Sequence, residues 1–225
     1  MGFRQALWGG SHAFLFALYH NSTISMDNNA SSSSQNSADP YKSSSFIGHS
    51  LWMCPAAGSA SRDAYSSIIS ETAHELGTFQ FLPHITLVAA IMTGEEDVLN
   101  RTRQLANQLA PYEFHLSRVS YRDAYFQCVY AEFERSEQVV AANQLARKVF
   151  PERQSDPPYT PHLSLVYGDL TETKKVEVVI PKLQAALKEK SKETGTIEVD
   201  SIQVWSTQGD VKEWYLVETI PLTGT

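Results

Sequence analysis

The stretch PHITLV at residues 83–88 returns in nearly the same form as PHLSLV at residues 161–166. Both copies read proline, histidine, apolar residue, hydroxyl residue, leucine and valine, and 78 residues separate them. In a β-strand, side chains two positions apart point to the same face, so each copy presents an imidazole and a hydroxyl together while its apolar residues face the core. Two such matches in one chain are far rarer than chance predicts. We therefore expect two related strands, one in each half of a pseudo-symmetric fold.

The sequence around these copies alternates between strand-like and helix-like patterns from residue 47 onward. Helical apolar spacing is found at residues 61–76, 94–109, 136–150 and 171–190, the last with a break or restart at Pro181. Strand patterns are found at residues 50–54, 83–90, 112–119, 125–133, 160–167, 196–205 and 211–220. We expect a hairpin from 112–119 and 125–133, and another antiparallel pair from the last two strands. The order indicates an α+β fold with mainly antiparallel pairing.

The chain divides near residue 46. Residues 21–45 are dense in serine and poor in large apolar side chains, so they bury too little surface to repay their ordering entropy. We predict a flexible extension over residues 1–46 and a single two-lobed domain over residues 47–225.

Composition restricts the partners and the compartment. The formal net charge is −7, with 18 Lys and Arg against 25 Asp and Glu, which argues against an extended nucleic-acid surface. The apolar stretch at residues 13–19 is too short to span a bilayer, and a targeting segment is the weaker interpretation of it. Cys54 and Cys128 lack the spacing of a zinc or redox pair and are interpreted as buried thiols. We expect a cytoplasmic protein with no membrane contact.

Two histidines around one substrate suit a reaction that needs a base and an acid at once, because an imidazole takes or gives a proton near neutral pH. Hydrolysis of a cyclic phosphodiester is such a reaction, since water attacks phosphorus in line with the ester oxygen that leaves. The hydroxyls of Thr86 and Ser164 would donate hydrogen bonds to the non-bridging oxygens, whose charge grows in the transition state. This chemistry needs no metal and no cofactor. Sequence motifs of other enzyme classes, such as a Walker loop or Gly-x-Ser-x-Gly, are missing.

The paired motifs resemble those of the 2H phosphoesterases, which are named for two His-x-Thr/Ser motifs on pseudo-symmetric lobes. SLWMCP at 50–55, YFQCVY at 125–130 and PHLSLVY at 161–167 are similar to the fungal and plant cyclic nucleotide phosphodiesterase branch, and the likeness covers about residues 47–220. The resemblance implies a bilobal α+β fold, with two mainly antiparallel sheets flanked by helices and a cleft between them.

The same resemblance implies a metal-independent hydrolase. Such an enzyme opens ADP-ribose 1'',2''-cyclic phosphate to ADP-ribose 1''-phosphate, and nucleoside 2',3'-cyclic phosphates to nucleoside 2'-phosphates. Its setting would be the disposal of by-products of tRNA splicing.

The resemblance assigns roles to the residues that match the family's motifs. His84 with Thr86 forms the first motif and His162 with Ser164 the second, and both histidines are expected to be catalytic. Our hypothesis is that His162 activates water and His84 protonates the departing oxygen, although the motifs support the pair more than this order and the reverse order stays open. Tyr167 lies three residues after Ser164, so it reaches the site only if the strand bends or ends there, a placement that the resemblance favours.

Other side chains are candidates for binding the substrate. Trp52, on the first strand, is expected to stack against a base, although a tryptophan there is as often part of the core. Tyr125 and Gln127 share a face and are weaker candidates for lining the pocket. A pyrophosphate would need a cation, and the spacing does not select among Arg62, Arg118 and Arg122.

Two alternatives remain open, namely a non-catalytic nucleotide-binding 2H module and a 2H enzyme that acts on RNA ends. Both histidines and both hydroxyls are present, which argues against the first, since binding alone needs no acid and base. The acidic folded part disfavours a long RNA substrate. We expect a monomer that binds small nucleotide cyclic phosphates, with no long nucleic acid and no membrane as a partner.

Overall fold

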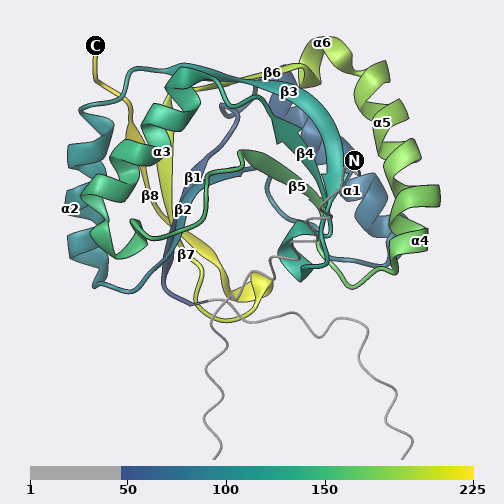
Figure 1. Cartoon of the computed structure of the whole chain (residues 1–225), viewed down its shortest axis with the longest axis horizontal. Helices are drawn as coiled ribbons and strands as arrows, with labels where there is room; N and C mark the ends of the chain where they lie inside the picture. The colour runs from purple at the N-terminus through teal and green to yellow at the C-terminus, as the bar shows by residue number, and fades with distance from the viewer. Residues whose placement is uncertain (1–46) are drawn as a thin grey trace, which may run out of the picture. The chain divides into compact units, whose positions relative to one another are not determined.

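The computed structural model describes residues 47–225, so the expectations for residues 1–46 lie outside the described part. Eight strands form one antiparallel sheet in the order β6-β3-β4-β5-β2-β1-β7-β8 (Figure 1). In chain order the strands are β1 His49–Met53, β2 Ile85–Ile91, β3 Tyr112–Tyr121, β4 Val129–Phe133, β5 His162–Val166, β6 Thr196–Val199, β7 Ser201–Ser206 and β8 Tyr215–Pro221.

The helices lie on the outer side of the curved sheet (Figure 1). The α-helices are α1 Ala60–Leu76, α2 Glu95–Ala106, α3 Glu137–Val149, α4 Glu172–Lys174, α5 Ile180–Glu189 and α6 Ser191–Thr194. Helix α1 contacts β5 and α5 contacts β3, whereas α2 contacts β7 and β8, and α3 contacts β2 and β3. The short turns are η1 Tyr125–Gln127, η2 Pro151–Arg153, η3 Lys175–Val179 and η4 Val211–Glu213.

The two motif strands lie side by side in the middle of the sheet. Strands β2 and β5 are joined by the antiparallel pair Ile85–Leu163. This join divides the sheet into two four-stranded halves, β6-β3-β4-β5 and β2-β1-β7-β8. The expected α+β class with antiparallel pairing is confirmed, and the two expected sheets are these halves, which hydrogen bonding links into one sheet.

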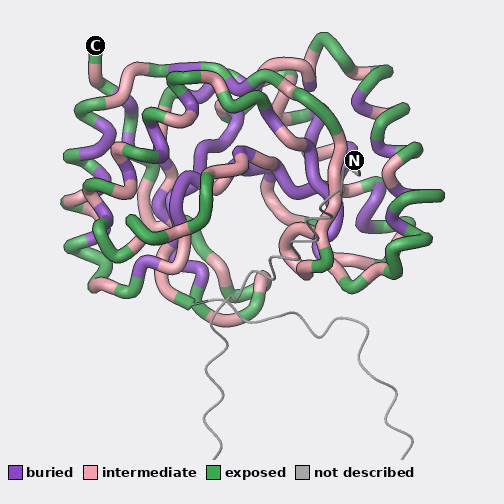
Figure 2. The backbone as a smooth tube through the Cα atoms, viewed as in Figure 1, coloured by how far each residue is buried: buried purple, intermediate pink, exposed green. Residues whose placement is uncertain are grey.

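The hydrophobic core fills the space between the sheet and the helices, where Figure 2 shows buried positions on the helix faces directed at the strands. Alternate positions of the central strands belong to this core, namely Leu51, Met53, Ile85, Leu87, Leu163 and Leu165. Side chains alternate across a strand, so the motif residues between these positions project from the opposite face. The pattern that predicted the strands therefore also separates a core face from a site face.

Several elements differ from the sequence expectations. The strand expected at residues 211–220 begins only at Tyr215, because the turn η4 precedes it. The strand expected at residues 196–205 is two strands, because β6 pairs with β3 while β7 pairs with β1 and β8. The strand expected from residue 125 begins at Val129, since the turn η1 precedes it. The expected break near Pro181 is the π-helical turn η3, which contains Glu177. Proline has no N–H to donate to the Glu177 carbonyl four residues earlier, which accounts for the irregularity.

None of the helices in residues 47–225 is long and apolar enough to cross a membrane.

Candidate active site

The four motif side chains meet at the join between the two halves of the sheet. Extending the antiparallel pair Ile85–Leu163 by one residue in each direction sets His84 opposite Ser164 and Thr86 opposite His162. Directly opposed residues in such a pair have neighbouring side chains on one face. The structure therefore brings the two motifs together in a group with the histidines on one diagonal and the hydroxyls on the other.

Both histidines are held by backbone carbonyls two residues earlier in the chain. Nδ1 of His84 lies 2.6 Å from the Leu82 carbonyl oxygen, and Nδ1 of His162 lies 2.8 Å from the Thr160 carbonyl oxygen. A carbonyl only accepts hydrogen bonds, so Nδ1 carries the hydrogen in both rings. Each neutral ring consequently presents the lone pair of Nε2 as the atom available for proton transfer.

Each Nε2 has a side-chain neighbour in this structure. The Tyr167 hydroxyl lies 3.3 Å from Nε2 of His84, and Nε2 of Gln127 lies 3.3 Å from Nε2 of His162. Tyr167 reaches the site because β5 ends at Val166, and its ring is fixed by stacking on Phe81 at 3.7 Å. The turn η1 carries Gln127 and places it beside His162. The same turn carries Tyr125, whose ring centroid lies 6.4 Å from that of Tyr167.

Trp52 packs between two rings. Its indole is stacked on His84, with ring centroids 3.6 Å apart and planes at 12°, and on Trp205 at 4.5 Å and 25°. Strand β1 lies between β2 and β7, so the two neighbours approach from opposite sides. Both indole faces are therefore in contact, and a nucleotide base would reach Trp52 only at its edge, which departs from the expected stacking.

The second half of the sheet repeats this arrangement in a looser form. Tyr130 on β4 pairs with Ser164 as Trp52 on β1 pairs with Thr86. The Tyr130 ring meets the His162 ring edge-on, with centroids 5.1 Å apart. Tyr130 and Trp205 were not among the residues predicted to support the histidines, because the register between strands places them there and no local sequence pattern does.

The two motif hydroxyls differ in their present partners. The Ser164 hydroxyl donates to the Phe126 carbonyl at 2.7 Å, so it must turn to donate to a ligand. Thr86 is half-buried, and its carbonyl accepts from the Tyr159 hydroxyl at 3.0 Å. The hydrogen bond from Tyr159 therefore fixes the backbone of Thr86.

Burial controls the protonation of the site. His84 is 6% exposed, and burial lowers its pKa from 6.5 to about 4, against the opposing effect of its hydrogen bond to Leu82. Burial also lowers the pKa of His162, with the Thr160 carbonyl opposing and the Arg122 charge adding to the shift. Burial raises the pKa of the Tyr167 phenol. Both imidazoles are therefore neutral at pH 7 and the phenol keeps its proton.

The structure connects one of the three candidate arginines to the motif residues by hydrogen bonds. Arg62 lies 3.4 Å from the Pro55 carbonyl, and Arg118 forms an ion pair with Glu132 at 3.0 Å. Arg122 donates to the Gln127 side chain and so is connected to His162.

Within residues 47–225 no cluster of three or more His, Cys, Asp or Glu side chains is arranged to hold a metal ion.

A single antiparallel sheet whose adjacent central strands carry two His-x-Thr/Ser motifs defines the 2H phosphoesterase class. Residues 47–222 match the family described as "Cyclic phosphodiesterase-like protein", and the chain belongs to that family. It is similar to "Cyclic phosphodiesterase" of Arabidopsis thaliana, with 27% identity over 127 residues that cover 56% of this chain and 68% of that protein. The chain is therefore a cyclic phosphodiesterase of the 2H family, a class of phosphodiester hydrolases, and the resemblance found in the sequence is confirmed.

Solved structures show the same fold at low sequence identity. The apo form of Escherichia coli LigT matches with a TM-score of 0.53 and 14% identity, over 80% of this chain and 99% of that one. The protein TT0787 of Thermus thermophilus matches with a TM-score of 0.51 and 16% identity, over 78% and 98%. LigT complexed with 3'-AMP matches with a TM-score of 0.51 and 11% identity, over 79% and 99%.

Proposed function

We propose that the protein is a 2',3'-cyclic-nucleotide 3'-phosphodiesterase for small nucleotides. It hydrolyses ADP-ribose 1'',2''-cyclic phosphate to ADP-ribose 1''-phosphate and nucleoside 2',3'-cyclic phosphates to nucleoside 2'-phosphates, compounds that arise as by-products of tRNA splicing. The observation that carries the proposal is the diagonal of two imidazoles, each with its hydrogen directed to a backbone carbonyl and its Nε2 directed to the site.

The reaction uses the two imidazoles in opposite directions. Nε2 of His162 takes a proton from water as the water oxygen forms its bond to phosphorus. The bond from phosphorus to the departing ester oxygen breaks, and that oxygen takes a proton from Nε2 of His84. One P–O bond forms, one breaks, and the net result is a proton moved from one histidine to the other, which solvent then restores.

His84 must be protonated before this step, although burial lowers its pKa to about 4 in the free protein. A phosphodiester brings a negative charge next to Nε2, and such a charge favours the imidazolium form. The Tyr167 hydroxyl can accept from a protonated Nε2, because a hydroxyl both donates and accepts. Proton uptake at His84 is therefore expected to accompany substrate binding.

The remaining motif residues bind the phosphate and support the histidines. Thr86 donates to one non-bridging oxygen, and Ser164 does the same once its hydroxyl turns away from the Phe126 carbonyl. Tyr167 contributes a third hydroxyl. Trp52 supports the plane of the His84 ring from one side and offers the substrate its edge.

The proposed substrate class and setting have separate support. The formal net charge of −7 favours a small nucleotide over a polyanion, and a structure of LigT, a protein of this fold, holds 3'-AMP. All the motif residues come from one chain, which supports action as a monomer.

Cys54 and Cys128 are free and buried, which supports a reducing compartment such as the cytoplasm.

Three substrates separate this proposal from its alternatives. Purified protein is incubated with ADP-ribose cyclic phosphate, with 2',3'-cyclic AMP and with an oligonucleotide that ends in a cyclic phosphate, all in EDTA. We expect turnover of the two small nucleotides. Cleavage of the oligonucleotide alone would instead identify an enzyme for RNA ends, and tight binding without product would identify a binding module.

Substitution tests the two histidines. His84→Ala and His162→Ala should each reduce kcat at least about 100-fold, because each removes a general acid or base. His74→Ala, at an exposed position of α1, is the matched control and should retain wild-type activity. Near-wild-type turnover by either of the first two variants would contradict the scheme.

A further inference from the structure

Hydrogen bonds connect Arg122, Gln127 and His162 in one directed chain. Arg122 Nη1 donates to Oε1 of Gln127 at 2.8 Å, and Nε2 of Gln127 lies 3.3 Å from Nε2 of His162. Nδ1 of His162 then donates to the Thr160 carbonyl at 2.8 Å. A guanidinium only donates and a carbonyl only accepts, so the two ends of the chain fix its direction. The amide nitrogen of Gln127, and not its oxygen, consequently faces the imidazole.

We propose that Arg122 and Gln127 are positioning residues for His162, and that they keep its Nε2 an acceptor of hydrogen bonds. A proton on Nε2 would meet the amide N–H of Gln127, which sets two donors against each other. The amide cannot turn to relieve this, because its oxygen is held by Arg122. The inference rests on the proposed function, in which His162 is the base.

The hydrogen-bond partner of His84 is not restricted to donating. The Tyr167 hydroxyl can donate to a neutral Nε2 of His84 or accept from a protonated one. His84 therefore tolerates both states that an acid must pass through, whereas His162 is held in the state that a base needs before it reacts. This difference gives a physical reason for the assignment of the base to His162 and the acid to His84.

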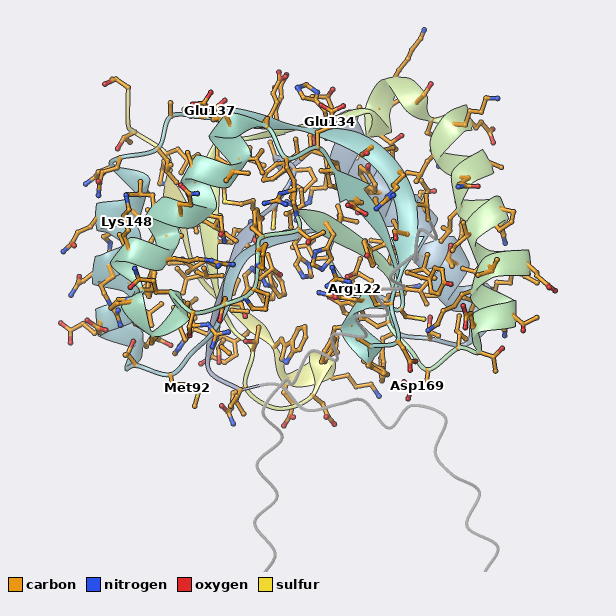
Figure 3. The ribbon with its side chains drawn as sticks, in the orientation of Figure 1. Met92, Arg122, Glu134, Glu137, Lys148 and Asp169 are labelled. Atoms are coloured by element: carbon orange, nitrogen blue, oxygen red, sulfur yellow. The ribbon has the colours of Figure 1, made fainter. Side chains whose placement is uncertain are left out.

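The fold holds this pair in place. The Arg122 amide donates to the Gln127 carbonyl at 3.0 Å, which closes the turn that carries both residues. Lys175 on η3, only 3% exposed, donates from Nζ to the Arg122 carbonyl at 2.9 Å and lies 3.9 Å from Asp123. Figure 3 places Arg122 on the inner side of the sheet, away from the helices. A buried cation thus fixes the backbone from which the guanidinium reaches Gln127.

The charged and titratable groups around His162 come from three elements. Arg122 follows β3, Tyr130 and Glu132 lie on β4, and His84 directly precedes β2. Arg122 lowers the pKa of His162 and Glu132 raises it. A substitution at Gln127 leaves all of these groups in place, so a change in the titration of His162 reports on the amide.

The test replaces the donor by an acceptor of the same shape. In Gln127→Glu the carboxylate still accepts from Arg122 but faces His162 with oxygen, so the pKa of His162 should rise. Gln127→Leu removes the donor without adding a charge and should shift it in the same direction by less. Gln104→Glu, on the exposed face of α2, makes the same charge change far from the motifs and should leave the titration as in wild type.

The titration of His162 is followed by NMR of its imidazole in substrate-free protein, which needs no turnover. In kinetics, the acidic limb of kcat/KM for Gln127→Glu should move to higher pH, with about a tenfold loss at pH 5 and KM changed by less than about threefold. An unchanged His162 titration in both Gln127 variants would overturn the inference and leave the proposed function intact. A wild-type protein without turnover would overturn the proposed function, while the titration would still decide the inference.

Discussion

Burial of His84 is expected to make the fold sensitive to acid. Its pKa is lowered from 6.5 to about 4 in the folded protein, so the unfolded chain takes up this proton first as the pH falls. The neutral ring therefore contributes its full stability above about pH 6.5, and that contribution is lost between there and about pH 4. One pKa unit corresponds to about 1.4 kcal/mol, and the loss between pH 7 and pH 5 is about 2 kcal/mol of unfolding free energy.

The perturbation is His84→Asn, which removes the titrating group and keeps a donor near the Leu82 carbonyl. Urea unfolding of wild type and variant at pH 7 and pH 5 gives the two losses of stability. We expect the wild type to lose about 2 kcal/mol more than the variant between these pH values. His74→Asn, an exposed substitution on α1, should behave like the wild type.

One outcome of the urea unfolding experiment would contradict the proposed role of His84 in acid sensitivity. If wild type and His84→Asn lose the same unfolding free energy to within about 0.5 kcal/mol, with equal m-values, the buried imidazole is not the source of acid sensitivity.

Further predictions concern the residues around the site. Trp52→Leu should lower kcat at least about tenfold more than Trp52→Phe, because only the phenyl ring still stacks on His84, and equal kcat values would contradict this support. Lys175→Met should lower the unfolding free energy by about 1–3 kcal/mol, since the Arg122 carbonyl loses its donor, and an unchanged urea midpoint would show otherwise. Burial raises the pKa of the Cys54 thiol to about 12, so iodoacetamide at pH 8 should label it only in urea. Rapid labelling of the native protein would contradict the buried position.

Much of the fold followed from local periodicity. The central strands were predicted within about two residues because each alternates apolar and polar positions around its histidine, and α1 was predicted within one residue. Alternation does not report which strand is the neighbour, so residues 196–205 were interpreted as one strand although Asp200 separates two with different partners. The turn η1 was missed for a related reason, since Tyr125 and Gln127 satisfy a strand pattern as well as a helical turn.

The candidate site shows the same limit. That the two histidines act together could be predicted from the repeated motifs, but their diagonal arrangement could not, because it depends on the direct pairing of β2 with β5. The neighbours of those histidines could not, because Gln127, Tyr130 and Trp205 reach them through strand register and turn geometry that no local pattern encodes. The placement of Tyr167 depended on where β5 ends, which a three-residue offset alone left open.

The join between the halves has a mechanical consequence. Strands β2 and β5 pair through Ile85 and Leu163, whereas β1 and β7 pair at four positions, so the line between the two motifs is the compliant part of the sheet. A ligand bound to His84 on one side and His162 on the other restrains the movement of the two halves of the sheet relative to each other. Ligand binding should consequently slow amide hydrogen exchange, and the slowing should be larger in β2 and β5 than in the outer strands.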